Sequence, residues 1–470
     1  MAGTKWALPG ETGIVGAEFY FPRNYVVQGE LEKFMKEKAG KFTIGLGQDE
    51  MGFCGDSEDA VSMALSVTHK LIENYNIDLK DIGCLVVGTE SEVDKSKSIK
   101  TYLMDLFVES GNHDVAGVDV KNACFGGTAA LEESINWVTV NQYKRQMAIA
   151  VMTDVAVYEE GNARPTGGAG AIAVLVGTGA PLTFGRTIVH EMRNTNDFYK
   201  PLKPRNTEYP TVNGQTSLSA YMAALDNCYR KFKEAKRKYD EDEVSISSYD
   251  SVAFHCPFSR LVQKAFGRLL LTDLSDDKYH VELPEISKDK IGELMDVDTY
   301  LKDRDFMGFW LKATQEEWTN KTLKNLTFNK RIGNMYTPSL YAQLMCLLAR
   351  LPENFDHHRM LMFSYGSGSA SAMFSFTISP GAALTQMRKS ARDALDQLDR
   401  RCEFSPEDYT AILKTREVMV STEAPKEPNK DWSSRMKLFP GTYYLKSVDA
   451  NYCRFYERYN EDVVVQNGHH

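Results

Sequence analysis

The stretch AGVDVKNACFGGTAALEESINWV, residues 116–138, places a single cysteine between an expected strand and an expected helix. Its first five residues, together with the preceding Val115, form the apolar and β-branched run VAGVDV, which indicates a buried strand. The run from Gly127 to Val138 has apolar residues at helical spacing, which predicts a helix. Cys124 therefore lies on an elbow just before a helix N-terminus, where backbone N–H groups and the helix dipole lower a thiol pKa. Gly126 and Gly127 let another backbone or a ligand approach closely.

The chain around this elbow alternates strand-like and helical runs. DIGCLVVGTES (81–91) precedes a helical SIKTYLMDLFVESG (98–111), and the second half repeats the plan in 250–270, 331–351 and 359–376. Strand-to-elbow units in a similar order in both halves predict an α/β fold with a mixed sheet and an internal duplication. We expect residues 1–180 to form the first half and 181–470 the second. Polar, helix-forming residues at 201–250 and about 275–330 are expected to be helical insertions on the surface.

Composition excludes several classes of protein. The 470 residues carry a net charge of −9, which argues against a general nucleic-acid binder. No run of 18 apolar residues predicts a membrane span, and the opening residues resemble neither a secretory signal nor a transit peptide. None of the eight cysteines forms a C-x-x-C pair, so we expect no zinc site and no disulfide framework in a cytoplasmic protein. The dinucleotide, Walker A and G-x-S-x-G motifs are absent, which weakens dehydrogenase, kinase and serine-hydrolase interpretations.

Polar residues stand at the ends of several expected strands. A cysteine taken alone is most often a small buried side chain in a turn, and a lone histidine is most often a satisfied core residue. If the halves are duplicated, however, these strand ends meet at one place, where a nucleophilic cysteine with a histidine and a carboxylate supports acyl transfer. A carboxylate ending an apolar strand has a raised pKa and becomes a usable acid or base near neutrality. The strand-end residues are Glu90, Glu92, Cys124, His255, Asn334 and Tyr365.

The sequence closely resembles the eukaryotic 3-hydroxy-3-methylglutaryl-coenzyme A (HMG-CoA) synthases of the thiolase superfamily. The matching segments occur in order over nearly the whole chain: KFTIGLGQ, VGTE with DKSKSIKTYLM, NACFGGTAAL, AVYEEGNARPTGG, DFYKP, FHCPFSRLVQK, GNMYTPSLYA, FSYGSGS and LFPGTYYL. The resemblance implies a five-layered αβαβα fold in two similar halves and a homodimer. It also implies condensation of acetyl-CoA with acetoacetyl-CoA and water to give HMG-CoA and CoA, in the mevalonate pathway.

Residue roles follow from the same resemblance. The family's nucleophile falls on Cys124, which becomes acetylated, and its general acid/base falls on Glu90 rather than Glu92. Its histidine falls on His255, which helps hold and polarise acetoacetyl-CoA. Backbone N–H groups near Cys124 and in the YGSGS loop are well suited to stabilise the enolate oxygen.

Further positions match the family's substrate and CoA contacts. The substrate pocket is matched by Asn162, Thr166, Ser217, Asn334, Ser367, Asp154, Tyr158 and Tyr365. The CoA site is matched by Ala39, Lys41, Arg260 and Lys264. Arg260 and Lys264 are four residues apart on an expected helix, so both face one side and can contact the same phosphate. The resemblance implies no cofactor and no metal.

Phe125 departs from the family pattern, which often has a tyrosine there. Glu191 and Asn194 replace histidines, and Lys38 replaces an acidic residue in the CoA region. None of these departures falls on Cys124, Glu90 or His255.

Three other functions are weaker. A thiolase or ketoacyl synthase commonly pairs its cysteine with two histidines or with histidine and asparagine, so Glu90 argues against them. An inactive scaffold relative would have lost its nucleophile or base. A papain-like hydrolase lacks its signature around the cysteine here.

Overall fold

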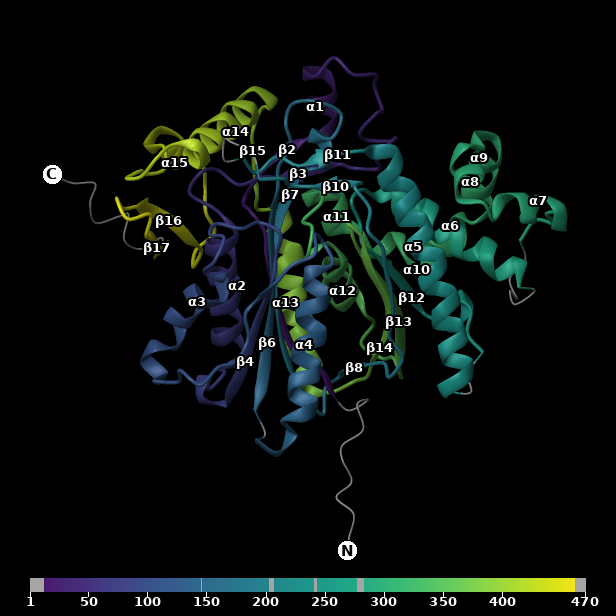
Figure 1. Cartoon of the computed structure of the whole chain (residues 1–470), viewed down its shortest axis with the longest axis horizontal. Coiled ribbons are helices and arrows are strands. Elements are labelled where there is room, and N and C mark those ends of the chain that lie inside the picture. The colour runs from purple at the N-terminus through teal and green to yellow at the C-terminus, as the bar shows by residue number, and fades with distance from the viewer. Residues whose placement is uncertain (1–11, 145, 203–206, 241–242, 277–282, 461–470) are drawn as a thin grey trace, which may run out of the picture.

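The structure is a computed structural model that describes residues 12–144, 146–202, 207–240, 243–276 and 283–460. The opening residues 1–11, on which the expectation of no leader partly rests, lie outside the described part. Figure 1 shows the elements in five layers, with helices outside two layers of strands and more helices between them. The αβαβα architecture expected from the resemblance is therefore confirmed.

Ten of the described strands form one hydrogen-bonded sheet in the order β12-β13-β14-β8-β1-β7-β6-β4-β5, with β9 beside β14, and the other described strands form three small sheets, β10-β11, β15-β2-β3 and β16-β17. The two layers of strands join where β1 pairs with β8 through Gly13↔Thr183 and Ile14↔Leu182. The central strands are buried on both faces, which explains their continuous apolar sequences. Their bounds are β1 Thr12–Tyr20, β4 Ile82–Gly88, β5 Asp119–Val120, β6 Met147–Ala156, β7 Gly168–Thr178, β8 Leu182–Phe184, β9 Val189–Met192, β12 Ser251–Phe254, β13 His358–Gly366 and β14 Ala370–Ile378.

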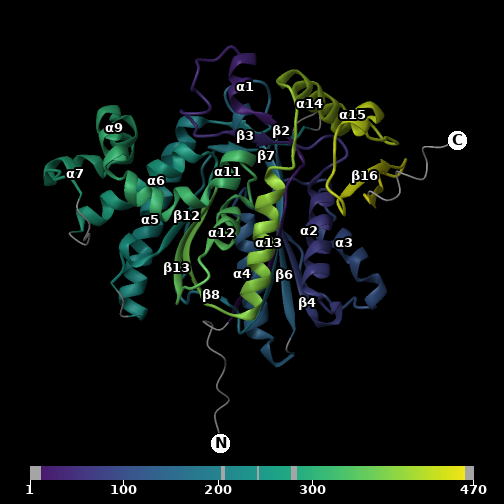
Figure 2. The same cartoon turned by 180° about the vertical axis from the view of Figure 1, so that it is seen from behind.

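Three large clusters of buried apolar residues make up most of the core, and each contains one layer of helices. The middle cluster holds α4 (Gly126–Val140), α12 (Ser339–Arg350) and α13 (Ala382–Leu398), which Figure 2 shows from behind. One outer cluster holds α2 (Ala60–Tyr75), and the other holds α5 (Gly214–Ala235) and α6 (Ser259–Ser275). The short helix α3 (Ile99–Leu103) lies on the α2 side.

One expectation about the second half is wrong in part. Residues 201–250 were expected to be a surface insertion, yet α5 buries Tyr221, Met222 and Leu225 as an outer layer of the fold. The polar composition of this helix hides its apolar stripe. The second expected stretch, about 275–330, contains the short helices α7 Lys288–Leu294, α8 Val297–Lys302, α9 Arg304–Ala313 and α10 Gln315–Lys321. These helices also bury Tyr300, Trp310 and Trp318 in the cluster that holds α5.

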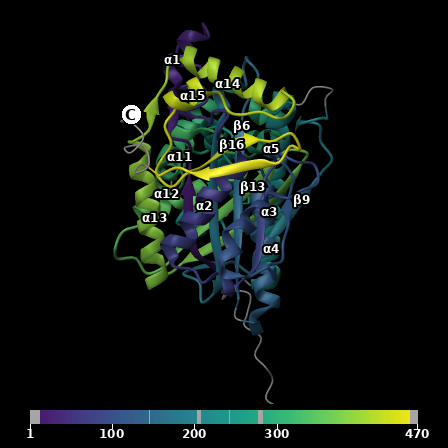
Figure 3. The ribbon, with the colours of Figure 1, turned by 90° about the vertical axis from the view of Figure 1, so that its left-hand side faces the viewer.

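The end of the chain returns to the first half. Figure 3 shows α14 (Pro406–Ser421), α15 (Lys430–Arg435) and the hairpin β16–β17 (Tyr443–Val448 and Arg454–Arg458) on the α2 side of the molecule. Arg454 and Tyr456 both donate to Asp59, the residue that caps α2. We keep 1–180 and 181–470 as the proposed halves. The remaining strands and the two other α-helices are β2 Asn24–Val27, α1 Gln28–Phe34, β3 Glu50–Gly52, β10 Phe198–Tyr199, β11 Thr211–Val212, α11 Thr327–Ile332 and β15 Cys402–Glu403.

Candidate active site

The cysteine elbow has a left-handed residue just before the nucleophile. Ala123 has φ +46°, a conformation that costs an L-residue about 1–2 kcal/mol, and α4 begins at Gly126. The turn is held by Phe125 N–H donating to Asn122 O at 3.1 Å. A Cβ on Gly366 would lie 2.5 Å from Asn122 O, so only glycine lets β13 approach this elbow. The elbow is thus fixed by strands from both layers.

Glu90 is brought to the elbow by a second close approach. A Cβ on Gly88, at the end of β4, would lie 2.3 Å from Gly126 O, while one on Gly127 would lie 2.8 Å from Thr337 O. These contacts confirm that the glycines allow backbones to meet here. Glu90 itself is buried, whereas Glu92 lies at the surface and pairs with Lys121.

The Glu90 carboxylate has a cationic neighbour in Lys200. Lys200 Nζ lies 3.4 Å from Glu90 Oε1. Burial raises the pKa of the Glu90 carboxyl to about 7, the Lys200 charge opposes this rise, and the Asp154 carboxylate adds to it. Glu90 is therefore poised to exchange a proton near neutral pH.

The expectation that the helix terminus lowers the thiol pKa of Cys124 is wrong. Burial raises the pKa of this thiol well above its usual range, and the carboxylates of Glu90 and Asp154 raise it further. The Lys200 ammonium and, to a smaller extent, the backbone N–H of Cys124 act in the opposite direction but are outweighed. The resting nucleophile is therefore a neutral thiol that shares one electrostatic environment with Glu90.

His255 follows β12 and is buried. The backbone of His255 is held on both sides: its backbone N–H donates to Phe363 O and its backbone carbonyl accepts from Tyr221 OH, both at 2.8 Å. Its ring stacks near Tyr365, with 6.5 Å between the centroids. Burial lowers the pKa of the His255 imidazole to about 3, so the ring is neutral at physiological pH.

Asp154, at the end of β6, acts as a clamp. One carboxylate oxygen accepts from Thr89 Oγ1 at 2.9 Å and from Glu90 N at 2.8 Å. The other accepts from Thr337 N at 3.1 Å and Thr337 Oγ1 at 2.5 Å. This fully buried side chain therefore fixes both the Glu90 turn and the elbow that precedes α12.

Three of the residues expected in the substrate pocket lie in two different places, one beside Tyr336 and two on Asp197. Tyr158 lies in a small cluster with Tyr336, which Cys124 and Phe198 contact. Tyr365 donates to Asp197 Oδ2 at 3.0 Å, and Ser217 Oγ lies 3.5 Å from the same oxygen.

The side chains of Asn334 and Thr166 are engaged in their own turns. Asn334 Oδ1 accepts from Tyr336 N at 2.9 Å and from Ser339 Oγ at 3.0 Å. Thr166 Oγ1 donates to Ala163 O at 2.7 Å.

The Gly/Ser loop offers fewer donors than expected. Gly368 N–H donates to Asp197 Oδ1 at 3.0 Å and Ser369 N–H donates to Arg193 O at 2.5 Å. Ser367 O accepts from Asn122 Nδ2 at 3.2 Å, which ties the loop to the cysteine elbow. Two of the N–H groups expected to stabilise an enolate are thus already in use.

The residues expected to bind CoA lie on two adjoining segments. Arg260 N–H donates to Leu46 O at 2.9 Å, and its guanidinium donates to Ile44 O at 3.3 Å, which places α6 beside the segment that contains Ala39 and Lys41. Lys264 lies one turn further along α6, and burial lowers the pKa of its ammonium. Lys41 Nζ donates to Asn162 Oδ1 at 2.9 Å, so the structure joins a residue expected to bind CoA to one expected in the substrate pocket.

Sequence reasoning missed Lys200, Asp197 and Thr337. The first two lie in the DFYKP segment and the third in GNMYTP, so both motifs were noticed without a role for these side chains. Lys200 contacts Glu90, Asp197 holds Tyr365, and Thr337 holds Asp154.

The departing residues have ordinary partners. Phe125 is buried with its ring edge-on to His190, and Glu191 pairs with Lys231 and Arg193. Among the described residues, no group of three or more His, Cys, Asp or Glu side chains is arranged to hold a metal ion. In the described part of the chain, no helix is long and apolar enough to cross a membrane.

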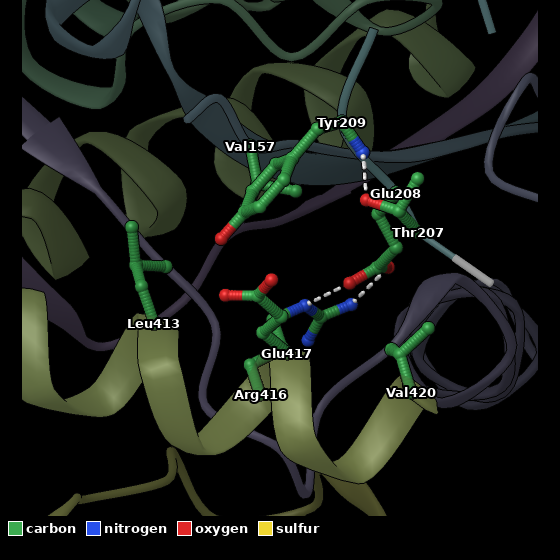
Figure 4. Close-up of a pocket in the computed structure, with 8 residues that line it drawn as sticks. All are labelled: Val157, Thr207, Glu208, Tyr209, Leu413, Arg416, Glu417 and Val420. Carbon is green, nitrogen blue, oxygen red and sulfur yellow. Dashed lines mark hydrogen bonds and ion pairs between the residues drawn. The ribbon is translucent and has the colours of Figure 1, made fainter. Parts of the chain in front are cut away.

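A separate pocket lies where α14 meets residues 207–209. Figure 4 shows Arg416 and Glu208 facing each other across it, with Tyr209 and Val157 on the other side. Arg416 donates to both Glu208 oxygens, at 2.7 and 2.8 Å, and it is almost fully buried. None of the proposed catalytic side chains lines this pocket, which we interpret as a structural contact.

Comparison with known proteins identifies the family. The N-terminal model of hydroxymethylglutaryl-coenzyme A synthase matches residues 8–181, and the C-terminal model matches 184–459. The chain is 45% identical to hydroxymethylglutaryl-CoA synthase of Caenorhabditis elegans, covering 97% of this chain and 96% of that protein. It is 42% identical to the cytoplasmic hydroxymethylglutaryl-CoA synthase of Gallus gallus, covering 97% and 88%.

A solved structure supports the same assignment. MvaS in complex with 3-hydroxy-3-methylglutaryl coenzyme A superimposes with a TM-score of 0.80 at 26% identity, covering 96% of this chain and 99% of that one. The chain therefore belongs to the hydroxymethylglutaryl-coenzyme A synthase family, with its thiolase-like fold.

Proposed function

We propose that this chain condenses acetyl-CoA with acetoacetyl-CoA and water to give HMG-CoA and CoA, as a step of the mevalonate pathway. The observation that carries the proposal is the close approach of two backbones, Gly88 before Glu90 and Gly126 behind Cys124, where a Cβ on Gly88 would lie 2.3 Å from Gly126 O. The family membership supplies the substrates, and one solved relative is described as a complex with HMG-CoA.

The first chemical step is acetyl transfer to Cys124. The sulfur forms a bond to the acetyl carbonyl carbon, the C–S bond to CoA breaks, and the thiol proton ends on the CoA thiol. A thioester held at the elbow then makes the later carbon–carbon bond effectively unimolecular. The backbone N–H of Cys124 lies close enough to stabilise charge at its own sulfur, which supports a donor role near the thioester.

The second step uses Glu90 as the base. Glu90 takes a proton from the acetyl methyl group, and the electron pair left behind forms the bond to the ketone carbon of acetoacetyl-CoA. Its pKa of about 7 gives it a substantial basic fraction at neutral pH. As this carbon–carbon bond forms, the C=O π pair moves onto the ketone oxygen, which neutral His255 stabilises as a hydrogen-bond donor. The oxygen then takes up the proton that Glu90 removed, giving the 3-hydroxyl and returning Glu90 to its ionised form. Water then hydrolyses the thioester and restores the Cys124 thiol.

The remaining residues shape the two substrates' sites. We assign CoA phosphate contacts to Arg260, Lys264 and Lys41, with Ala39 beside them, because three cationic side chains lie on adjoining segments. We assign the acyl pocket to the set Asn162, Thr166, Ser217, Asn334, Ser367, Asp154, Tyr158 and Tyr365. No cofactor or metal enters this reaction scheme.

We further propose a cytoplasmic homodimer. Several relatives are named cytoplasmic, although one from Sus scrofa is named mitochondrial. The short strand β5 ends the described sheet path and follows the exposed Val118, so a second copy has an edge to pair with. Light scattering at micromolar concentration tests this: a mass near twice the 53.0 kDa of one chain supports it, and a monomer contradicts it.

The chemical proposal is tested by intact-protein mass after brief incubation with acetyl-CoA alone. The unmodified chain and Glu90→Ala should each gain one acetyl group, while Cys124→Ala should gain none. Cys453→Ala is the matched control, because that cysteine is exposed and open to nonspecific acetylation. Addition of acetoacetyl-CoA should then release the acetyl group as HMG-CoA only when Glu90 is present. Acetylation that persists without Cys124 contradicts the proposal.

A further inference from the structure

Lys200 is a charged residue beside the reacting groups, and the proposed reaction assigns it no role. Its side chain is 21% exposed, while that of Glu90 is 6% exposed. Among the ion pairs of the described residues, this is the contact that supplies Glu90 with a positive charge, at 3.4 Å. Lys200 Nζ also lies 4.7 Å from the centre of the Tyr336 ring, on the side where Tyr158 and Cys124 gather.

The backbone around Lys200 is anchored on both sides. The preceding residues Phe198 and Tyr199 pair with β11, and the Phe198 ring packs edge-on to Tyr336 at 5.8 Å. Asp197, one residue earlier, accepts from Tyr365 and Gly368. A lysine has four rotatable side-chain bonds, so this anchoring and the Tyr336 ring are what hold its ammonium at Glu90.

The chemistry of Glu90 creates a need for such a charge. Burial and the neighbouring Asp154 carboxylate both disfavour the ionised form of Glu90, which is the form that accepts the methyl proton. A cation at ion-pair distance favours the ionised form without admitting water. The Lys200 ammonium lies near the Tyr336 ring and its charge also acts on Asp154, while its ion-pair contact is with Glu90.

We propose that Lys200 is a positioning residue for the carbon–carbon bond-forming step, holding the Glu90 carboxylate ionised and aimed at the acetyl group on Cys124. This inference rests on the proposed function, since it requires Glu90 to be the base. It assigns Lys200 no contact with substrate.

The test separates acetyl transfer from condensation. Acetyl-enzyme is formed first, then mixed with acetoacetyl-CoA across a range of pH, and the rate of HMG-CoA formation is followed in a single turnover. Removing the cation in Lys200→Met raises the pKa of Glu90, so the acidic limb of this profile moves to higher pH. A shift of one pH unit lowers the rate about tenfold at pH values below both pKa values. Lys200→Arg keeps the charge and should restore the limb.

Two controls keep the result specific. Lys121→Met makes the same substitution at an exposed lysine, the one that pairs with Glu92. The pH profile of this variant should match that of the unmodified chain. The Lys200 charge also lowers the thiol pKa of Cys124, so acetylation of Cys124 in Lys200→Met is measured separately, and starting from preformed acetyl-enzyme keeps that step out of the pH profile. An unmoved acidic limb in Lys200→Met, or a limb that Lys200→Arg fails to restore, overturns the inference. If Glu90→Ala condenses normally, the proposed function itself fails instead.

Discussion

Asp154→Asn tests how the active site is held together, because the substitution changes one oxygen into an NH₂ group. Asp154 accepts four hydrogen bonds, two on each oxygen, and two of them come from the backbone N–H groups of Glu90 and Thr337. An asparagine has one accepting oxygen, so its NH₂ must face one of these pairs. The threonine hydroxyl in that pair can turn and accept, but the backbone N–H cannot.

The magnitude follows from that one orphaned donor. An unsatisfied buried N–H costs about 1–3 kcal/mol, so the free energy of unfolding of Asp154→Asn should fall by that amount in urea titrations. The Glu90 turn or the Thr337 elbow must also shift, and misplacement on the scale of 1 Å costs about a hundredfold in rate. Condensation in single turnovers should therefore slow by between about tenfold and about a hundredfold.

The same variant makes a prediction of opposite sign from Lys200→Met. Asp154 is a like charge beside Glu90, and its removal lowers the Glu90 pKa, so the acidic limb of condensation moves to lower pH. Exposed Asp114→Asn is the matched control and should change neither stability nor rate. Unfolding free energy within about 0.5 kcal/mol of the unmodified chain, together with a full condensation rate, would refute the clamp.

In the unmodified chain, single-turnover condensation should fall about tenfold from pH 8 to pH 6 as Glu90, with its pKa near 7, takes up a proton; a flat profile contradicts Glu90 as the base. Gly366→Ala should slow Cys124 acetylation at least tenfold, because its Cβ would lie 2.5 Å from elbow backbone atoms. Gly308→Ala is the control, since its Cβ meets nothing within 4 Å, and equal acetylation rates in the two variants would dismiss the contact. Arg416→Met removes a buried guanidinium that donates to the carbonyls of Gly55 and Glu58, and leaving these acceptors unsatisfied should lower the free energy of unfolding by about 1–3 kcal/mol. Arg435→Met, at an exposed ion pair, should cost at most about 0.5 kcal/mol, and equal losses in the two arginine variants would argue against the buried contacts of Arg416.

The positions of the main site residues at strand ends could be predicted from local sequence patterns. Apolar strands ending in Glu90, Cys124 and His255 are visible in short windows of sequence, and topology then brings these ends together. Roles came from resemblance rather than from pattern, since no local signal distinguishes Glu90 from Glu92. The structure separates them by burial, with Glu90 inside and Glu92 paired at the surface.

Long-range contacts account for what the sequence did not reveal. The helix terminus beside Cys124 is a local feature, so a lowered thiol pKa was a reasonable prediction. The burial of the thiol and the carboxylates of Glu90 and Asp154 come from other strands, and they dominate. Lys200 lies in an extended segment with no periodic pattern, so only the packing of β10 beside Tyr336 could reveal its position.

The two elbows show how one backbone device serves two purposes. Ala123 and Tyr336 both have left-handed φ, at +46° and +54°, and each stands three residues before the helix that follows. Cys124 and Thr337 therefore occupy equivalent positions in the two halves. Thr337 gives both its N–H and its hydroxyl to Asp154, which in turn holds Glu90.

The strained geometry that presents the nucleophile in one half thus presents a clamp for the base in the other. The two helices meet at matching positions, where Thr128 Oγ1 lies 2.8 Å from Tyr341 OH, two residues into each helix. This contact ties together the first turns of α4 and α12, the two helices that follow the elbows.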